Sequence, residues 1–326
     1  MSEAKIHWSR IGESGTVLGI RLMLMSYCVL GHRGFRLFLF PVMVYYYLFR
    51  VEARNASKQY LRHVAEFLPS ARQSKLSSFR HFMAFGEMLL DKLLAWMGKI
   101  TRRDVVFETP DVISEFESNR AGGVIIVSHL GNFEVCSALA SDLPHLKLTV
   151  LLYTRHAEKF NQVLSQFGGK AEVEVMQVTE ISPVTAMLLA QRVRAGEYIV
   201  IAGDRTPPSG GGRVTSAHFL GRNASFPQGP FILAGLLKCP VYLMFCLKLQ
   251  GQYHLYIEHF ASRLKMDNRA SRQKALEEAV RKYARRLEHY CVMAPLQWFN
   301  FFPYWTDTEG QRDNPIYHSG RDRGAS

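Results

Sequence analysis

The sequence predicts an α/β fold in which a central, mostly parallel sheet is flanked by helices and preceded by an apolar helical segment. Short apolar runs alternate with amphipathic stretches between residues 121 and 260, and this alternation is typical of a sheet that is covered on both faces. Hydrophobic residues make up 48% of the 326 residues and charged residues 21%, which is enough apolar material for one large core. Several predicted strands end in polar residues, and open α/β sheets build their sites at such strand ends.

Residues 1–54 form the first predicted unit, a helical segment that anchors the chain to a membrane. Two apolar segments, residues 15–30 and 35–49, are separated by a glycine-containing turn at residues 31–34. Each segment is shorter than the roughly 20 residues of a spanning helix, so we expect a hairpin that lies in the membrane or partly crosses it. The tyrosines at residues 45–47 and the flanking arginines suit the headgroup boundary. The alternative that both segments are helices of a soluble core stays open.

The second unit, residues 55–305, is predicted to hold the main domain. Helical spacing of apolar residues predicts one element that ends before Pro69 and a long amphipathic helix over residues 76–96. Apolar runs rich in β-branched residues predict strands at residues 105–107, 124–127, 148–153, 173–176, 198–202, 241–247 and 253–257. Further helices are expected at residues 110–119, 135–143, 157–167, 183–195, 231–237 and 269–289. Residues 306–326 are polar and glycine-rich, and we expect a disordered tail there.

The strand at residues 124–127 delivers Ser128 and His129 to its carboxyl end, and a carboxylate follows at Glu134. A histidine at a strand end can act as a general base, and a nearby carboxylate can fix its tautomer and stabilise the imidazolium. We therefore predict His129 as the base and Glu134 as its orienting carboxylate. The spacing alone is a weak signal, because a buried, hydrogen-bonded histidine at a strand end gives the same pattern.

Two other predicted strands end in polar groups that we expect at the same edge of the sheet. Arg155 follows the strand at residues 148–153, and Asp204 and Arg205 follow the strand at residues 198–202. Polar groups that converge at one edge indicate a site. Other interpretations stay open for each residue, because both arginines suit surface salt bridges and Asp204 suits the cap of a turn.

The formal net charge of +12 favours anionic partners, namely lipid headgroups, an acidic protein or nucleic acid. No nucleic-acid-binding motif accompanies this charge, so we expect no nucleic-acid partner. A non-catalytic protein that binds lipid or nucleic acid through its basic faces is the alternative to an enzyme. The 5 cysteines show no metal-ligand spacing and are odd in number, which fits a reducing compartment. The sequence contains no zinc pattern, Walker loop or Rossmann glycine motif, and we expect no metal site.

The chain carries five blocks in this order: VSHLGNFE, YTRH, IAGDRTP, FLGRNASFPQGP and KCPVYLMF. Their order and spacing resemble the lysophospholipid acyltransferase superfamily, and most closely the late acyltransferases of bacterial lipid A biosynthesis. The superfamily signature H-x-x-x-x-[DE] is matched by His129 and Glu134, and the segment APLQW resembles a further C-terminal block. The resemblance extends to about Trp305 and so covers most of the chain.

The resemblance implies an α/β acyltransferase domain over residues 55–305, a membrane anchor before it and no metal or redox cofactor. Members of the family move a fatty acyl chain from a thioester, on acyl carrier protein or coenzyme A, to a hydroxyl of a lipid or glycolipid. The resemblance also implies an enzyme on the cytoplasmic side of the inner membrane, and we expect a monomer. A lysophospholipid, glycerol phosphate or an aryl-polyene lipid is an alternative acceptor. Carried over by position, the resemblance implies substrate contacts at Asn132, Arg155, Asp204, Arg205, Pro227 and Gly229.

The implied chemistry needs a base, an oxyanion site and correct placement, because a thioester is already activated. His129 would take the proton of the acceptor hydroxyl, and Arg155 or backbone N–H groups near Gly131 would stabilise the developing oxyanion. Cys136 lies in the apolar segment after Glu134, so we interpret it as a packing residue and not as a nucleophile.

Overall fold

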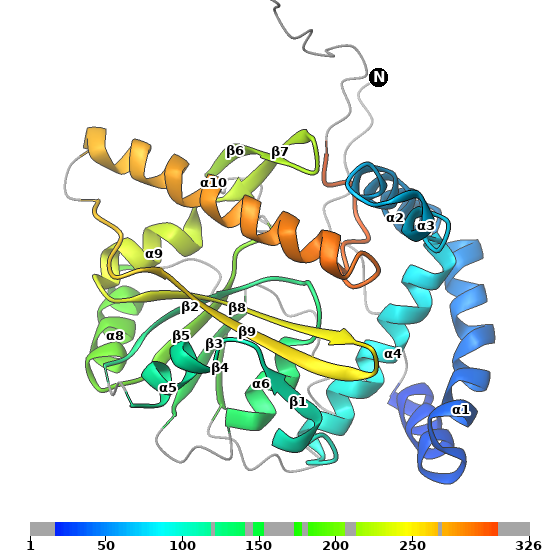
Figure 1. Ribbon diagram of the computed structural model, residues 1–326. Helices are drawn as coiled ribbons and strands as arrows, with labels where there is room; N and C mark the ends of the chain where they lie inside the picture. Colours follow the sequence, from blue (N-terminus) through cyan, green and yellow to red (C-terminus); the bar gives the residue numbers. More distant parts are fainter. Residues whose placement is uncertain are drawn as a thin grey trace, which may run out of the picture.

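A seven-stranded sheet forms the centre of the computed structural model, which describes residues 17–118, 121–140, 146–152, 173–177, 182–205, 213–266 and 269–305. The strands lie in the order β1-β9-β8-β2-β5-β3-β4 (Figure 1). Their bounds are β1 Val105–Phe107, β2 Gly123–Val127, β3 Leu148–Leu152, β4 Val173–Gln177, β5 Tyr198–Ala202, β8 Val241–Leu249 and β9 Gln252–Ala261. Neighbouring strands are parallel except for the antiparallel pair β8 and β9. The predicted α/β class is confirmed.

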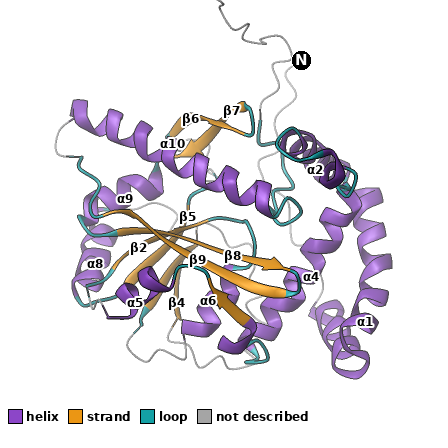
Figure 2. Cartoon of the chain, in the orientation of Figure 1, coloured by secondary structure: helices purple, strands orange, loops and turns teal. Residues whose placement is uncertain are grey.

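Helices cover both faces of this sheet, as the two ribbon views show (Figures 1 and 2). Val124 and Ile126 of β2 pack in one apolar cluster with residues of α9 and α10, whereas Ile125 and Val127 pack in another with α5 and α6. This alternation is the period of two of a strand. Because β2 is buried on both faces, its sequence is an uninterrupted apolar run. The covering helices are α5 Pro110–Ser118, α6 Phe133–Ala140, α8 Pro183–Arg194, α9 Gly229–Leu237 and α10 Arg269–Met293.

A second sheet consists of the antiparallel strands β6 (Val214–Phe219) and β7 (Arg222–Pro227), which pack against α10. The sequence prediction contains no strands here. The signal that it missed is a two-residue turn, Leu220 and Gly221, flanked by alternating buried and exposed residues. Both turn residues have positive φ, 52° and 73°, as a tight hairpin of two residues requires.

Four helices precede the sheet: α1 Val17–Phe49, α2 Val51–Ala65, α3 Ser70–Gln73 and α4 Ser78–Trp96. The two predicted apolar segments form the two parts of α1, which are two helices that meet at a kink at Gly31, where φ is 66° and ψ is −165°. α1 packs side by side with α4 (Figure 1). The backbone of α4 lies against the side chain of Leu39 at Gly86, where a Cβ atom would lie 2.6 Å from that side chain.

The side of α1 that faces away from α4 is apolar and exposed. Leu37 and Phe49 are 72% and 68% exposed, whereas Phe35, Leu39 and Met43 are buried against α4. Among the described helices, none is long and apolar enough by itself to span a membrane, but Arg21–Phe49 and α2 meet that test together as a pair bent by 94°. Other exposed apolar residues of α1 are Leu22, Met25, Val29, Leu30, Phe38, Phe40, Val42, Tyr45 and Leu48.

Several expectations fall outside the described residues. They concern residues 1–16, the predicted helix at residues 157–167, Arg155, and the predicted tail at residues 306–326. The expected boundary after residue 54 falls inside α2, so a division of the chain at that point stays a proposal.

Candidate active site

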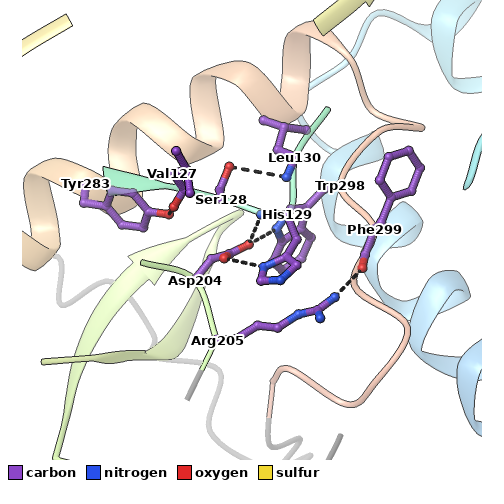
Figure 3. A network of polar contacts seen from close by, with 9 residues as sticks. All are labelled: Val127, Ser128, His129, Leu130, Asp204, Arg205, Tyr283, Trp298 and Phe299. Atoms are coloured by element: carbon purple, nitrogen blue, oxygen red, sulfur yellow. Dashed lines mark hydrogen bonds and ion pairs between the residues drawn. The ribbon is translucent and has the colours of Figure 1, made fainter. Parts of the chain in front are cut away.

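The carboxyl ends of β2 and β5 bring His129 and Asp204 together (Figure 3). The two strands are parallel neighbours in register, so the residues that follow them emerge side by side. Gly203 permits this close approach. A Cβ atom at Gly203 would lie 2.7 Å from the side chain of Ile126 and 2.9 Å from the ring of Tyr283. The β2–β5 pairing therefore places a carboxylate beside the histidine that follows β2.

The carboxylate of Asp204 accepts three hydrogen bonds (Figure 3). Its Oδ1 lies 2.8 Å from Nδ1 of His129. Its Oδ2 accepts the backbone N–H of His129 at 2.8 Å and the indole N–H of Trp298 at 3.0 Å. Asp204 is 1% exposed, so its carboxylate cannot bond to bulk water. These three donors supply the hydrogen bonds that burial removes.

This bonding sets the tautomer of His129. A carboxylate accepts hydrogen bonds, so Nδ1 carries the proton and Nε2 has its lone pair available. The side chain of His129 is 34% exposed, which leaves the ring accessible to a substrate. The arrangement is that of a general base held and polarised by a buried carboxylate.

Burial and the nearby Arg205 favour a neutral imidazole at His129. Desolvation lowers the pKa of His129, as does the nearby guanidinium of Arg205, and together they outweigh the opposing effect of Asp204. Burial alone would raise the pKa of Asp204, but His129 and Arg205 lower it to about 2. At neutral pH the pair is therefore an imidazole with a free lone pair beside an ionised carboxylate.

The turn after His129 is fixed by the end of β8. Gly131 has a φ of 75°, and a Cβ atom there would lie 2.0 Å from the carbonyl oxygen of Cys246. The N–H of Asn132 donates to that same carbonyl at 2.8 Å, and the N–H of Gly131 donates to the carbonyl of Gln297 at 2.9 Å. The turn thus needs glycine both for its backbone conformation and for space.

Residues 297–300, which we call the Trp298 segment, hold the pair from the other side. Besides the indole bond to Asp204, the N–H of Phe299 donates to the carbonyl of His129 at 2.9 Å. The carbonyl of Phe299 accepts from the guanidinium of Arg205 at 2.8 Å (Figure 3). One short C-terminal segment therefore contacts both strand-end loops of the site.

Glu134 does not make the predicted contact with the imidazole. Glu134 lies in the first turn of α6, a helix that packs against α4, and its carboxylate forms an ion pair with Lys92 of α4. Burial would raise the pKa of Glu134, but the Lys92 ammonium outweighs it and lowers that pKa. The carboxylate that contacts Nδ1 of His129 is that of Asp204. This corrects the prediction that Glu134 makes the orienting contact.

Asn132 and Arg205, both predicted to contact substrate, follow β2 and β5, the two strands that carry the pair. The amide of Asn132 is buried and donates to the carbonyl of Met88 on α4 at 3.3 Å. Arg205 lies over the ring of Phe302 at 5.5 Å, and burial lowers its pKa to about 10. Arg205 is thus a partly buried cation that donates to the carbonyl of Phe299 and lies near Asp204.

Two further predicted substrate contacts, Pro227 and Gly229, lie where β7 is followed by α9. Pro227 ends β7 and Gly229 begins α9. Between them, Gln228 bonds through its side chain to Thr215 and through its backbone N–H to the carbonyl of Arg213. These bonds join the start of α9 to β6 and not to His129. Arg155 lies outside the described residues.

Sequence analysis missed the role of Trp298. The signal was present in the APLQW block, but nothing local indicates that its indole reaches a strand end 94 residues earlier in the chain. Within the described part of the chain, no group of three or more His, Cys, Asp or Glu side chains could hold a metal ion.

Comparison with protein families identifies the class of reaction that the chain catalyses. A model of the bacterial lipid A biosynthesis acyltransferases matches residues 81–307, a range that contains His129, Asp204 and Trp298. A search of curated proteins found no match. The fold and the family match define an acyltransferase. The chain belongs to the bacterial lipid A biosynthesis acyltransferase family, as the resemblance implied.

Proposed function

We propose that this enzyme moves a fatty acyl chain from a thioester donor, carried by acyl carrier protein or coenzyme A, to a hydroxyl of a lipid or glycolipid. The observation that supports this proposal most directly is the His129–Asp204 pair, which holds Nδ1 and leaves Nε2 for a substrate. A hydroxyl needs a base of this kind before it attacks a thioester. Family membership supplies the reaction class.

In the proposed mechanism, Nε2 of His129 takes the hydroxyl proton while the hydroxyl oxygen bonds to the thioester carbonyl carbon. The negative charge of Asp204 stabilises the imidazolium that forms. The carbon–sulfur bond then breaks, and the thiolate leaves with the proton from the imidazolium. This general-base step contributes roughly 10²–10⁴-fold, and no acyl-enzyme is required.

The oxyanion of this mechanism needs donors other than the turn after His129. The N–H groups of Gly131 and Asn132 are already bonded to the carbonyls of Gln297 and Cys246, so they have no free hydrogen for a substrate. We therefore propose Arg155 as the oxyanion donor, because it is the basic residue that the family resemblance implies at the site. Glu134 keeps a negative charge near His129 and ties α6 to α4 through Lys92.

We further propose that the exposed apolar face of α1 contacts the cytoplasmic side of the inner membrane. An exposed apolar patch of this length is unusual for a protein surface that faces only water. Arg33 and Arg50 are exposed near the two ends of its second half, and arginines there attract anionic headgroups. α1 packs on α4, and α4 contacts Asn132 and Glu134. A lipid acceptor bound at α1 would therefore be separated from the turn after His129 by α4 alone.

The proposal also includes acyl carrier protein as the acyl donor and a monomeric enzyme. A net charge of +12 suits an acidic carrier protein as the donor, and a monomer on the membrane needs no second chain to complete the His129–Asp204 pair. Lysophospholipid, glycerol phosphate and aryl-polyene lipids are the alternative acceptors. A test of the acceptor therefore has to separate these classes.

The experiment is acyl transfer by the purified full chain in vesicles or detergent. Acyl carrier protein and coenzyme A thioesters are supplied in turn with lipid A precursors, lysophospholipid or glycerol phosphate. Release of free thiol and the mass of the new acyl ester are both measured. We expect a new ester that needs the wild-type chain and is lost in His129→Ala. Binding of lipid without thiol release, or equal turnover by His129→Ala, would contradict the proposal.

A further inference from the structure

A second histidine, His81, contacts the Trp298 segment through the carbonyl of Trp298. His81 lies in the first turn of α4 and is fully buried. Its Nε2 lies 2.9 Å from the carbonyl oxygen of Trp298, and its Nδ1 lies 3.0 Å from Oγ of Ser57 on α2. Oγ of Ser78 donates to Ser57 at 2.8 Å. His81 thus joins two N-terminal helices to the C-terminal segment.

The positions of the protons in this chain of bonds can be assigned. A carbonyl only accepts, so Nε2 of His81 carries the proton and Nδ1 accepts from the hydroxyl of Ser57. The hydroxyl of Ser57 in turn accepts a hydrogen bond from the hydroxyl of Ser78. Every donor in this chain of bonds therefore faces an acceptor. Burial lowers the pKa of His81 to about 4, which keeps this neutral arrangement in place at physiological pH.

Trp298 connects this chain of bonds to the catalytic pair. Its carbonyl is held by His81, whereas its indole N–H donates to Asp204 at 3.0 Å. The next peptide N–H, that of Phe299, donates to the carbonyl of His129 at 2.9 Å. A shift of the Trp298 backbone would therefore disturb the contacts of both members of the pair. Edge-on ring contacts with Tyr60 and Phe219 restrain the indole itself.

We propose that His81 is a positioning residue of the acyltransferase: it holds the Trp298 backbone so that the indole stays on Asp204 and the carboxylate stays on His129. This proposal rests on the proposed function, because it assigns His81 to the same reaction. A buried histidine with two hydrogen bonds is often only a core residue. What distinguishes His81 is its acceptor, the carbonyl of Trp298: the side chain of Trp298 donates to Asp204, and the next N–H along the chain donates to His129.

A double-variant cycle tests whether His81 acts through Trp298. His81→Leu and Trp298→Phe are each expected to lower kcat roughly 10- to 100-fold, because a displacement of about 1 Å at the pair costs that much. The KM for the thioester donor should stay unchanged. The double variant should lose no more than the more damaged single variant. Losses that multiply would show that His81 acts independently of Trp298 and would overturn the proposal.

Rescue and matched controls separate positioning from folding. His81→Gln should recover most of the activity, because its amide N–H can reach the carbonyl of Trp298 and its oxygen can accept from Ser57. If His81→Leu does not fold, Ser57→Ala replaces it as the milder variant. The control is His63→Leu, since His63 is buried on α2 and lies against Trp305. It should leave kcat close to the wild-type value. An equal loss in His63→Leu would overturn the proposal.

A spectroscopic measurement keeps this proposal separate from the proposed function. The indole N–H resonance of Trp298, assigned by its loss in Trp298→Phe, reports the hydrogen bond to Asp204. It should shift in Asp204→Asn and shift in the same direction in His81→Leu, but not in His63→Leu. An unmoved resonance in His81→Leu would overturn the role of His81. A wild-type chain without transferase activity would refute the proposed function, whereas the resonance would still decide whether His81 holds Trp298.

Discussion

Nδ1 of His129 and Oδ1 of Asp204 lie 2.8 Å apart although 75 residues separate them in the chain. The contact exists because β2 and β5 are parallel neighbours whose ends are in register. It is reinforced by the backbone N–H of His129 and the indole of Trp298, which both donate to the other carboxylate oxygen. A pair with this many restraints fixes the ring orientation before a substrate arrives, which is the condition for efficient general-base catalysis.

The pH dependence of acyl transfer should report the lowered pKa of His129. Its imidazole acts as a base only when neutral, so kcat/KM should fall as the pH falls through that pKa. Desolvation and Arg205 lower the pKa below the ordinary value of 6.5, so the acid limb should have its midpoint below pH 6.5. A pH series of kcat/KM with a thioester donor measures it. A midpoint above pH 6.5 would contradict the electrostatic account of the site.

His81 should make the fold less stable in mild acid. Its pKa is about 4 in the folded chain against 6.5 for an ordinary histidine, so the unfolded chain binds more protons between these values. Stability is then present above pH 6.5 and is lost as the pH falls toward 4, by about 2 kcal/mol between pH 7 and 5. Chemical unfolding of wild type and His81→Gln at both pH values measures it. Equal losses in both proteins would contradict the prediction.

Gly131→Ala should damage both stability and activity. The substitution adds a Cβ atom at 2.0 Å from the Cys246 carbonyl and strains a backbone with φ of 75°, which we expect to cost at least roughly 1–3 kcal/mol. Gly98→Ala is the matched control, because Gly98 has a φ of 67° but no atom within 4 Å of the added carbon. It should cost about 1 kcal/mol and leave kcat unchanged. Similar effects of the two changes on kcat would argue against a fixed turn.

Polar substitutions on the outer face of α1 should weaken membrane binding. Leu37→Gln and Phe49→Gln each remove an exposed apolar side chain from the proposed contact, and each should lower vesicle binding roughly tenfold. Cosedimentation with anionic phospholipid vesicles measures this. Val184→Gln on α8 is the control, since Val184 is 75% exposed but belongs to another surface. Unchanged binding of the α1 variants, or an equal loss in Val184→Gln, would refute this contact.

Local signals in the sequence were sufficient for the main sheet and for the strand end that carries His129. The apolar run of β2 is continuous because both of its faces are buried, and His129 follows directly. The hairpin β6–β7 was missed because its strands alternate small polar and apolar residues without a strong β-branched run. Such segments take their structure from packing, here against α10.

The partner of His129 could not be predicted from local spacing. Glu134 is five positions away, but the first turn of α6 directs it to Lys92. Asp204 becomes the partner only through the pairing of β2 with β5, and Trp298 only through the return of the C-terminal segment to the sheet edge. Both contacts depend on the order and pairing of strands that are far apart in the sequence. Neither hydrophobic periodicity nor a local motif predicts that pairing.

The most direct test of the central claim compares Asp204→Asn with Glu134→Gln. Both changes remove one negative charge with little change in size, and kcat for acyl transfer is measured on each purified, folded variant. Asp204→Asn should lose roughly 10³–10⁴-fold, because the amide no longer holds the Nδ1–H tautomer of His129. Glu134→Gln should lose about tenfold, since it disturbs only the ion pair with Lys92 and a more distant charge. Equal losses, or a greater loss in Glu134→Gln, would contradict the assignment of Asp204 as the carboxylate that orients His129.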